Sequence, residues 1–174
     1  EYIAGGMVIG TIIGALAARL VGMTSMPEMV ALFNGSGGAA SLLVGWATLY
    51  GGGIETFTAV TILLAILIGG LTFTGSIIAY AKLSEVMNSA AIVFKGQRFV
   101  NSLVVAGIVY AAYMFCLDPQ ADSQWLYVTL GLALLLGIMA VIPIGGADMP
   151  VVISLLNSYS GIAACAAGFA INNN

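Results

Sequence analysis

Six long apolar stretches dominate the sequence and leave few folds open to it. Each is close to the length of about 20 residues that an α-helix needs to cross a bilayer. They run from Ile3 to Leu20, Met29 to Tyr50, Phe57 to Leu83, Phe99 to Leu117, Trp125 to Ile144 and Val151 to Ile171. Lipid admits only helices and closed barrels, and the short alternating strands of a barrel are absent from the sequence. The chain is therefore predicted to be an all-α, polytopic transmembrane helical bundle with about six spanning helices.

The composition supports a membrane setting and excludes several functional classes. Charged residues make up only 6% of the chain, against about a quarter in soluble domains. A net charge of −3 with four scattered bases excludes a nucleic-acid surface. The chain has no histidine, and its two cysteines lack ligand spacing, so no metal site is predicted. No nucleotide-binding or nucleophile motif occurs, so no catalytic residue is expected in this segment.

The charged residues predict which side of the membrane each loop faces. Alternate crossing places all four bases on one face: Arg19, Lys82, Lys95 and Arg98. Because cytoplasmic loops are enriched in Lys and Arg, we expect that face to be cytoplasmic. The loops of the other face carry acids, namely Glu55, Asp118 and Asp122. Lys82 and Glu85 have the spacing of an exposed ion pair on a helix.

An internal repeat places polar side chains inside two of the apolar stretches. "MPEMVALFNGSGGAA" (Met26 to Ala40) matches "MPVVISLLNSYSGIA" (Met149 to Ala163) at a constant offset of 123 residues. Asn34 and Asn157 each lie eight residues beyond the methionine of their copy, which is about 12 Å along a helix. Ser76 lies six residues before Lys82, or about 9 Å from the same face. Three helices are thus expected to bring amides and hydroxyls to a similar depth.

Two interpretations of this polar layer remain open from the residues alone. The side chains could hydrogen-bond between helices, with small neighbours allowing close packing. They could also line a hydrated path, because unpaired polar groups are costly in lipid. None of them titrates near neutral pH, so they could order water but not hold a proton. Glu28 and Asp148 are the nearest ionisable groups, and both also suit the first turn of a helix without any functional role.

Three segments carry a resemblance that is more specific than these patterns. They are "MPEMVALFNGSGGAAS", "TFTGSIIAYAKL" and "IGGADMPVVISLLNSYSG". They resemble the membrane domain of the beta subunit of proton-translocating NAD(P) transhydrogenase. The resemblance implies that residues 1–174 are a fragment of the transmembrane proton-channel domain, lacking the final helix and the soluble NADP(H)-binding domain. It also implies a bacterial inner membrane or a mitochondrial inner membrane as the location.

The resemblance further implies cofactors and partners that lie outside this segment. In the family, hydride passes between NADH and NADP+ in soluble domains while protons cross the membrane part. NADP(H) and NAD(H) would therefore bind to those soluble domains. The implied partners are the membrane helices and NAD(H)-binding domain of the alpha subunit, the chain's own NADP(H)-binding domain, and the lipid bilayer. The complete enzyme is expected to be a homodimer.

Carried over by position, the resemblance assigns roles to particular residues. Asn34 falls where many members have a histidine assigned to proton transfer, Asn157 matches a polar channel residue, and Ser76 belongs to a third channel helix. Ser158 is placed on the path beside Asn157. Because an amide cannot replace an imidazole as a proton carrier near neutral pH, Asn34 is expected to order water instead.

Two residues are predicted to couple the membrane part to the nucleotide-binding part. Asp148 lies in the loop that faces the NADP(H) domain in the family, and Glu28 occupies the corresponding end of the other repeat copy. Two other functions stay open from the residues alone. One is a secondary transporter for a small solute, because parallel repeats with polar midplane groups also occur there. The other is a structural membrane anchor whose polar layer serves only packing.

Overall fold

The computed structural model describes residues 2–51, 54–119 and 123–171, and its regular structure in these ranges is entirely helical. Its long helices are α1 (Tyr2–Leu20), α2 (Met26–Thr48), α3 (Thr56–Leu83), α4 (Gln97–Leu117), α5 (Gln124–Val141) and α6 (Met149–Ala170). Each of these six is long and apolar enough to cross a membrane. The prediction of an all-α bundle of about six spanning helices is thus confirmed.

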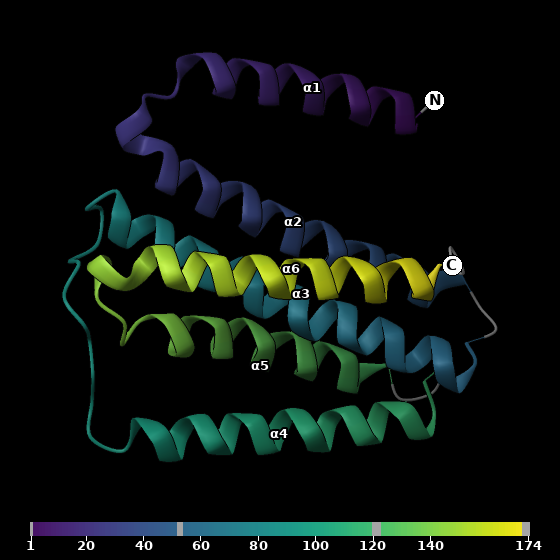
Figure 1. Cartoon of the computed structure of the whole chain (residues 1–174). Coiled ribbons are helices and arrows are strands. Elements are labelled where there is room, and N and C mark those ends of the chain that lie inside the picture. The colour runs from purple at the N-terminus through teal and green to yellow at the C-terminus, as the bar shows by residue number, and fades with distance from the viewer. Residues whose placement is uncertain (1, 52–53, 120–122, 172–174) are drawn as a thin grey trace.

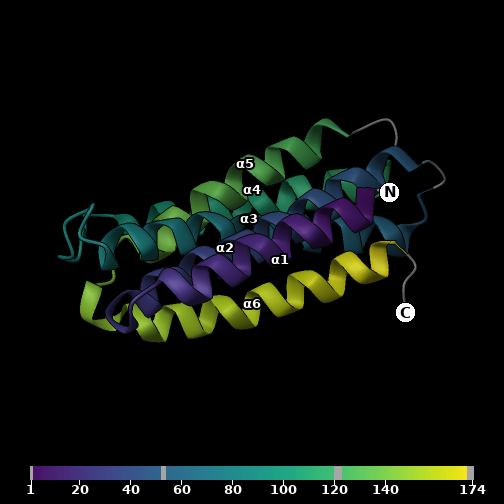
Figure 2. The same cartoon turned by 90° about the horizontal axis from the view of Figure 1, so that it is seen from above.

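The helices pack around α3, which contacts α2, α5 and α6 (Figure 1). Helix α4 packs mainly against α5. Helix α1 diverges from α2 at one edge of the bundle (Figure 1) and lies over the other helices in the view from above (Figure 2), and none of its residues is buried. The core of the described chain is therefore formed by α2 to α6, and α1 presents most of its surface to other molecules.

Successive long helices run in opposite directions, which fixes where the charges lie (Figure 1). One end of the bundle, which we call the basic end, contains the last residues of α1, α3 and α5 and the first residues of α2, α4 and α6. The four bases lie there, as the sequence predicted. Glu55 and Asp118 flank α3 and α4 at the other end, whereas Asp122 lies outside the described residues. That the basic end faces the cytoplasm remains a prediction, which cysteine labelling of Ser25 from each side of sealed vesicles would test.

The two repeat copies begin with the same local structure. A short 3-10 turn precedes each helix, η1 (Met23–Ser25) before α2 and η3 (Gly146–Asp148) before α6. In both, proline occupies the first turn of the α-helix, where its missing N–H costs no hydrogen bond. The repeat in the sequence is therefore a repeat in structure.

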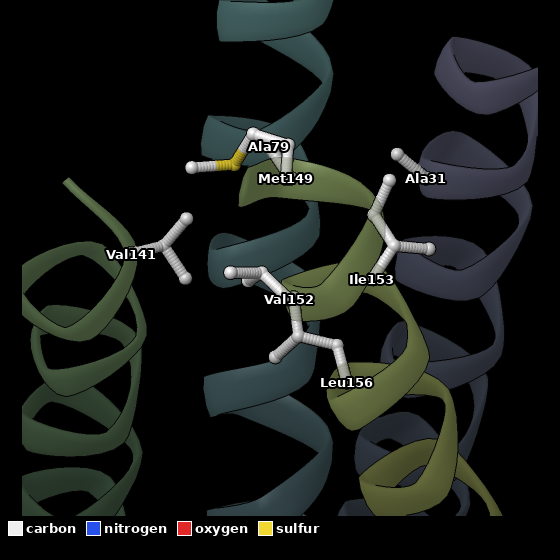
Figure 3. Close-up of a cluster of buried hydrophobic side chains, with 7 residues drawn as sticks. All are labelled: Ala31, Ala79, Val141, Met149, Val152, Ile153 and Leu156. Carbon is white, nitrogen blue, oxygen red and sulfur yellow. The ribbon is translucent and has the colours of Figure 1, made fainter. Parts of the chain in front are cut away.

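A buried apolar cluster at the basic end fixes the start of α6 against its neighbours. Its members come from α2, α3, α5 and α6 and are Ala31, Ala79, Val141, Met149, Val152, Ile153 and Leu156 (Figure 3). Met149, the first residue of α6, has no exposed surface. The cluster thereby sets the position of the loop before α6, which carries Asp148.

Helix α5 ends at Val141, three residues earlier than the sequence suggested. Pro143 has no N–H and cannot donate to the carbonyl of Met139, four residues back. That carbonyl accepts a hydrogen bond from the side-chain amide of Gln97 instead, at 3.3 Å. The apolar residues after Val141 therefore belong to a loop whose carbonyl groups need partners from other segments.

Candidate functional site

The polar centre of the bundle is a hydrogen bond between α2 and α3. Asn34 Nδ2 donates to Ser76 Oγ at 3.0 Å, and the two side chains are 7% and 1% exposed. The helices come this close because Gly35 has no side chain: a methyl group there would lie 3.1 Å from the Ser76 Cβ. Two of the residues predicted to share a depth are thus in direct contact.

A third polar side chain, Thr72, belongs to this centre and was not singled out from the sequence. It lies one helical turn from Ser76 on α3 and has no exposed surface. A methyl group at Gly38 of α2 would lie 3.0 Å from the Thr72 Cβ, so Thr72 faces the same interface as Asn34. The only sequence signal was its position four residues before Ser76, on the same side of the helix.

Asn157 lies at the level of Asn34 but on the outer face of α6. Helices α2 and α6 run in the same direction, and a methyl group at Gly37 would lie 2.9 Å from Ser160 Oγ. Gly37 and Ser160 are equivalent in the repeat, so the asparagines three residues before them share one depth. Asn157 is exposed, and no hydrogen bond joins it to Asn34 or Ser76 within the described residues. Figure 1 shows α6 alongside α2 and α3.

Ser158 is exposed on the same outer face as Asn157. Its hydroxyl donates to the carbonyl oxygen of Ser154 at 3.3 Å, one turn back on α6. On this face, the Asn157 amide makes no hydrogen bond within α6 among the described residues, whereas the Ser158 hydroxyl is hydrogen-bonded to its own helix. In the bilayer, water or another helix must cover such a polar face.

The two predicted coupling acids lie at the basic end, one at each repeat copy. Glu28 is in the first turn of α2 and is partly buried, whereas Asp148 is the last residue of η3 and is exposed. Both are therefore at the end of the bundle where the loops gather, and both have surface available to another molecule.

Lys82 has a role that the sequence did not predict. It is only 1% exposed, and its Nζ donates to three carbonyl oxygens: that of Ala90 at 3.1 Å and those of Ile142 and Ile144 at 2.6 Å each. The predicted exposed pair with Glu85 is wrong. Helix α3 ends at Leu83 and the backbone turns through Glu85 with a φ of 57°, so the helical spacing is lost. The carbonyl groups after α5, which carry partial negative charge, bind the ammonium instead.

Lys82 is the centre of a wider set of bonds that joins two loops. The backbone N–H of Gly146 donates to the carbonyl of Ser89 at 2.8 Å, and that of Ile92 donates to the carbonyl of Ile142 at 3.2 Å. The Ser89 hydroxyl donates to the carbonyl of Lys82 at 3.0 Å. We call this set, residues 82–92 and 142–146, the loop clasp. It connects the segment before Asp148 to the helix that carries Ser76.

Two features of nucleotide and metal sites are a strand before a glycine-rich loop and a cluster of metal-ligating side chains, and the described residues contain neither. They contain no strand that could precede a glycine-rich phosphate loop. A groove of about 330 Å³ between α4 and the helices α3, α5 and α6 is lined by aliphatic side chains and Tyr159, with no charged group. No group of three or more His, Cys, Asp or Glu residues occurs in the described ranges.

Comparison with known proteins identifies the family. A family model described as NAD(P) transhydrogenase beta subunit matches residues 1–174. The NAD(P) transhydrogenase subunit beta of Rhodospirillum rubrum is 39% identical over 174 residues, covering 95% of this chain and 37% of that protein. The subunit of the same name from a defined strain of that organism gives the same values. The chain thus spans little more than a third of the length of these relatives. With six membrane-spanning helices and this similarity over its whole length, the chain is an integral membrane protein that belongs to the NAD(P) transhydrogenase beta subunit family.

Proposed function

We propose that this bundle conducts protons in the membrane part of an NAD(P) transhydrogenase and couples their movement to hydride transfer between NADH and NADP+ in soluble domains. The observation that carries the proposal is the buried Asn34–Ser76 hydrogen bond within spanning helices. A polar pair costs more than an apolar pair in such a place unless it has further partners. Water is the partner that proton movement requires.

The proposed path uses Asn34, Ser76, Asn157 and Ser158 to order water rather than to carry charge. Amides and hydroxyls do not titrate near neutral pH, so protons would pass along the water and not be stored on these side chains. Asn34 and Asn157 share one depth on adjacent helices, with Asn34 facing inward and Asn157 facing outward. Helix α6 thus separates a buried polar centre from an open polar face.

Coupling is proposed to act through Asp148 and Glu28 at the basic end. The loop clasp joins the segment before Asp148 to α3, where Lys82 is six residues from Ser76, about 9 Å along the helix. A partner that moves the loop would therefore move the helix that holds the polar centre. The proposed partner is the soluble NADP(H)-binding domain, and NADP(H) and NAD(H) are proposed to bind only in the soluble domains.

Membership of a beta-subunit family implies that other subunits accompany the chain. Helix α1, which has no buried residue, and the polar face of α6 are surfaces that they could cover. We propose that these partners are the alpha subunit with its NAD(H)-binding domain and a second copy of the complex. The proposed location is a bacterial inner membrane or a mitochondrial inner membrane.

Replacing Asn34 by leucine in the complete enzyme tests the proposal. Leucine has a similar volume but neither donor nor acceptor, so water should no longer be held at the polar centre. We expect proton pumping by reconstituted enzyme to fall about tenfold or more, since a broken hydrogen-bonded contact of 1–2 kcal/mol corresponds to such a factor. Hydride exchange between nucleotides already bound should persist.

The matched control is Ser36→Ala on the exposed side of α2, where the hydroxyl donates only to the carbonyl of Leu32. It should pump normally. Normal pumping by the Asn34→Leu enzyme would contradict the proposed function, as would equal loss of pumping and of hydride exchange.

A further inference from the structure

Two buried polar atoms between α2 and α3 have no hydrogen-bond partner among the residues that the structure describes. They are Asn34 Oδ1 and Thr72 Oγ1, on side chains that are 7% and 0% exposed. Native proteins leave few such atoms unpaired, and an ordered water is a common partner for them. Partner subunits would only bury this interface further, so they cannot expose the two atoms to bulk solvent.

Exchanging the nitrogen and oxygen of the Asn34 amide does not change the number of its atoms that lack a partner. If its nitrogen and oxygen were exchanged, the Ser76 hydroxyl would donate to the oxygen, and the nitrogen would be left without a partner. Either way, one amide atom of Asn34 is satisfied by Ser76 and the other is not. The unpaired amide atom is therefore a property of the fold.

The two unpaired atoms lie on one ladder of contacts between antiparallel helices. Gly35 of α2 faces Ser76, and Gly38, one turn further, faces Thr72. Ser76 and Thr72 are likewise one turn apart on α3, a rise of about 5.4–6 Å. A polar atom beside Ser76 and the Thr72 hydroxyl, if separated by about this rise, can share one water, because two hydrogen bonds of about 2.8 Å span about 5.6 Å.

The backbones of α2 and α3 touch on the far side of Thr72 from the basic end. A methyl group at Gly38 would lie 2.8 Å from the carbonyl oxygen of Gly69, and one at Gly69 would lie 2.6 Å from the carbonyl oxygen of Gly38. No water fits between backbones this close. This contact closes the interface toward the far end, so along the two helices a water beside Thr72 has its open direction toward the basic end, past Asn34 and Ser76.

From this geometry we propose that α2 and α3 enclose a water-binding site in which Asn34 and the Thr72 hydroxyl hold one water beside Ser76. Within the described residues, Ser76 Oγ accepts the bond from Asn34 and donates none, so it supplies a third polar group to the site. Thr72 is then a positioning residue that fixes the innermost water. Its importance for pumping rests on the proposed function, whereas the site itself rests on the unpaired atoms.

Two variants of the complete enzyme distinguish the effect of the Thr72 hydroxyl from the effect of its side-chain shape. Thr72→Val keeps the branched side chain and removes the hydroxyl, whereas Thr72→Ser keeps the hydroxyl. Thr61→Val is the matched control, because Thr61 is also buried on α3 but its hydroxyl donates to the carbonyl of Thr58 at 2.9 Å. Cryo-electron microscopy maps that show ordered waters, together with pumping by the same preparations, give two independent readouts.

We expect density for one water between Asn34 and Thr72 in the parent, the Thr72→Ser and the Thr61→Val enzymes, and none in the Thr72→Val enzyme. Pumping should fall about fivefold in Thr72→Val, the factor that corresponds to one lost hydrogen bond, and should recover in Thr72→Ser. A parent map that shows other buried waters but none here would overturn the site, as would density that persists in Thr72→Val. Density that behaves as expected with unchanged pumping would support the site and would contradict the role of this water in pumping.

Discussion

The hydroxyl and amide side chains of this bundle differ in whether their own helix satisfies them. Many hydroxyls donate to the carbonyl one turn back, among them Ser36, Ser41, Thr48, Thr129 and Ser158. Such groups add little polarity to a membrane helix, because donor and acceptor are paired locally. Asn34 and Thr72 each keep an atom without a partner in the described part of the chain, although both are buried. The polar character of the bundle centre therefore comes from a few residues and not from all of its hydroxyls.

Asn157 is the residue that tests whether the outer face of α6 belongs to the path. Because Asn157 is exposed in the described chain, Asn157→Leu should leave the packing of these helices nearly unchanged. If its only role were packing against a partner helix, the change would cost about 1 kcal/mol of association. We expect pumping to fall sharply while thermal stability and dimer content of the enzyme stay nearly unchanged. A loss of pumping that simply follows dissociation would remove Asn157 from the path.

At the scale of elements, the loop clasp depends on one buried ammonium. Lys82 lies in the last turn of α3, and its ammonium donates hydrogen bonds to carbonyl groups of two other segments. The start of α6 is also held by the apolar cluster around Met149. Loop and helix are therefore fixed together at the basic end, and the position of Asp148 is defined by both.

Lys82→Met should destabilise the enzyme by about 2–4 kcal/mol, because it removes three hydrogen bonds from a charged donor and leaves the carbonyl oxygens of Ala90 and Ile144 without that donor. We expect faster amide hydrogen exchange across residues 84–96 and a lower temperature of thermal inactivation. Lys95→Met is the control, since Lys95 is exposed at the same end and should change neither. Unchanged exchange in the Lys82→Met enzyme would show that the clasp does not hold this loop.

Length and apolar composition predicted the elements well, because a membrane-spanning helix needs little else. The end of α5 was misplaced because Ile142 and Ile144 are as apolar as the helix before them, and only the donors Gln97 and Lys82 make a loop possible there. Lys82 was placed on the surface because its partners are backbone groups of distant segments, which no spacing rule reveals. The inward face of Asn34 and the outward face of Asn157 could not be distinguished, since their helices are apolar on all sides.

At the scale of the whole molecule, the bundle is asymmetric from one end to the other. The basic end holds the loop clasp, Glu28 and Asp148. At the far end, the hydroxyl groups of Tyr50 and Tyr127 form a hydrogen bond of 3.0 Å. The α2–α3 backbone contact at Gly38 and Gly69 lies between the polar centre and that far end. We therefore expect water to enter the polar centre from the basic end, where the proposed coupling residues also lie.

The coupling of nucleotide state to proton movement is the central claim, and Asp148→Asn in the complete reconstituted enzyme tests it most directly. The variant keeps the size of the side chain and removes its charge at an exposed position. Glu55→Gln, which removes an exposed acid at the far end of the bundle, is the control. The measurement is coupled turnover with proton pumping, NADP(H) affinity, and hydride exchange between bound nucleotides on the same preparation. We predict that Asp148→Asn impairs coupled turnover and changes NADP(H) affinity about fivefold or more, as coupling free energies of this kind do, while exchange between bound nucleotides persists. Normal coupled turnover with unchanged NADP(H) affinity would contradict the account.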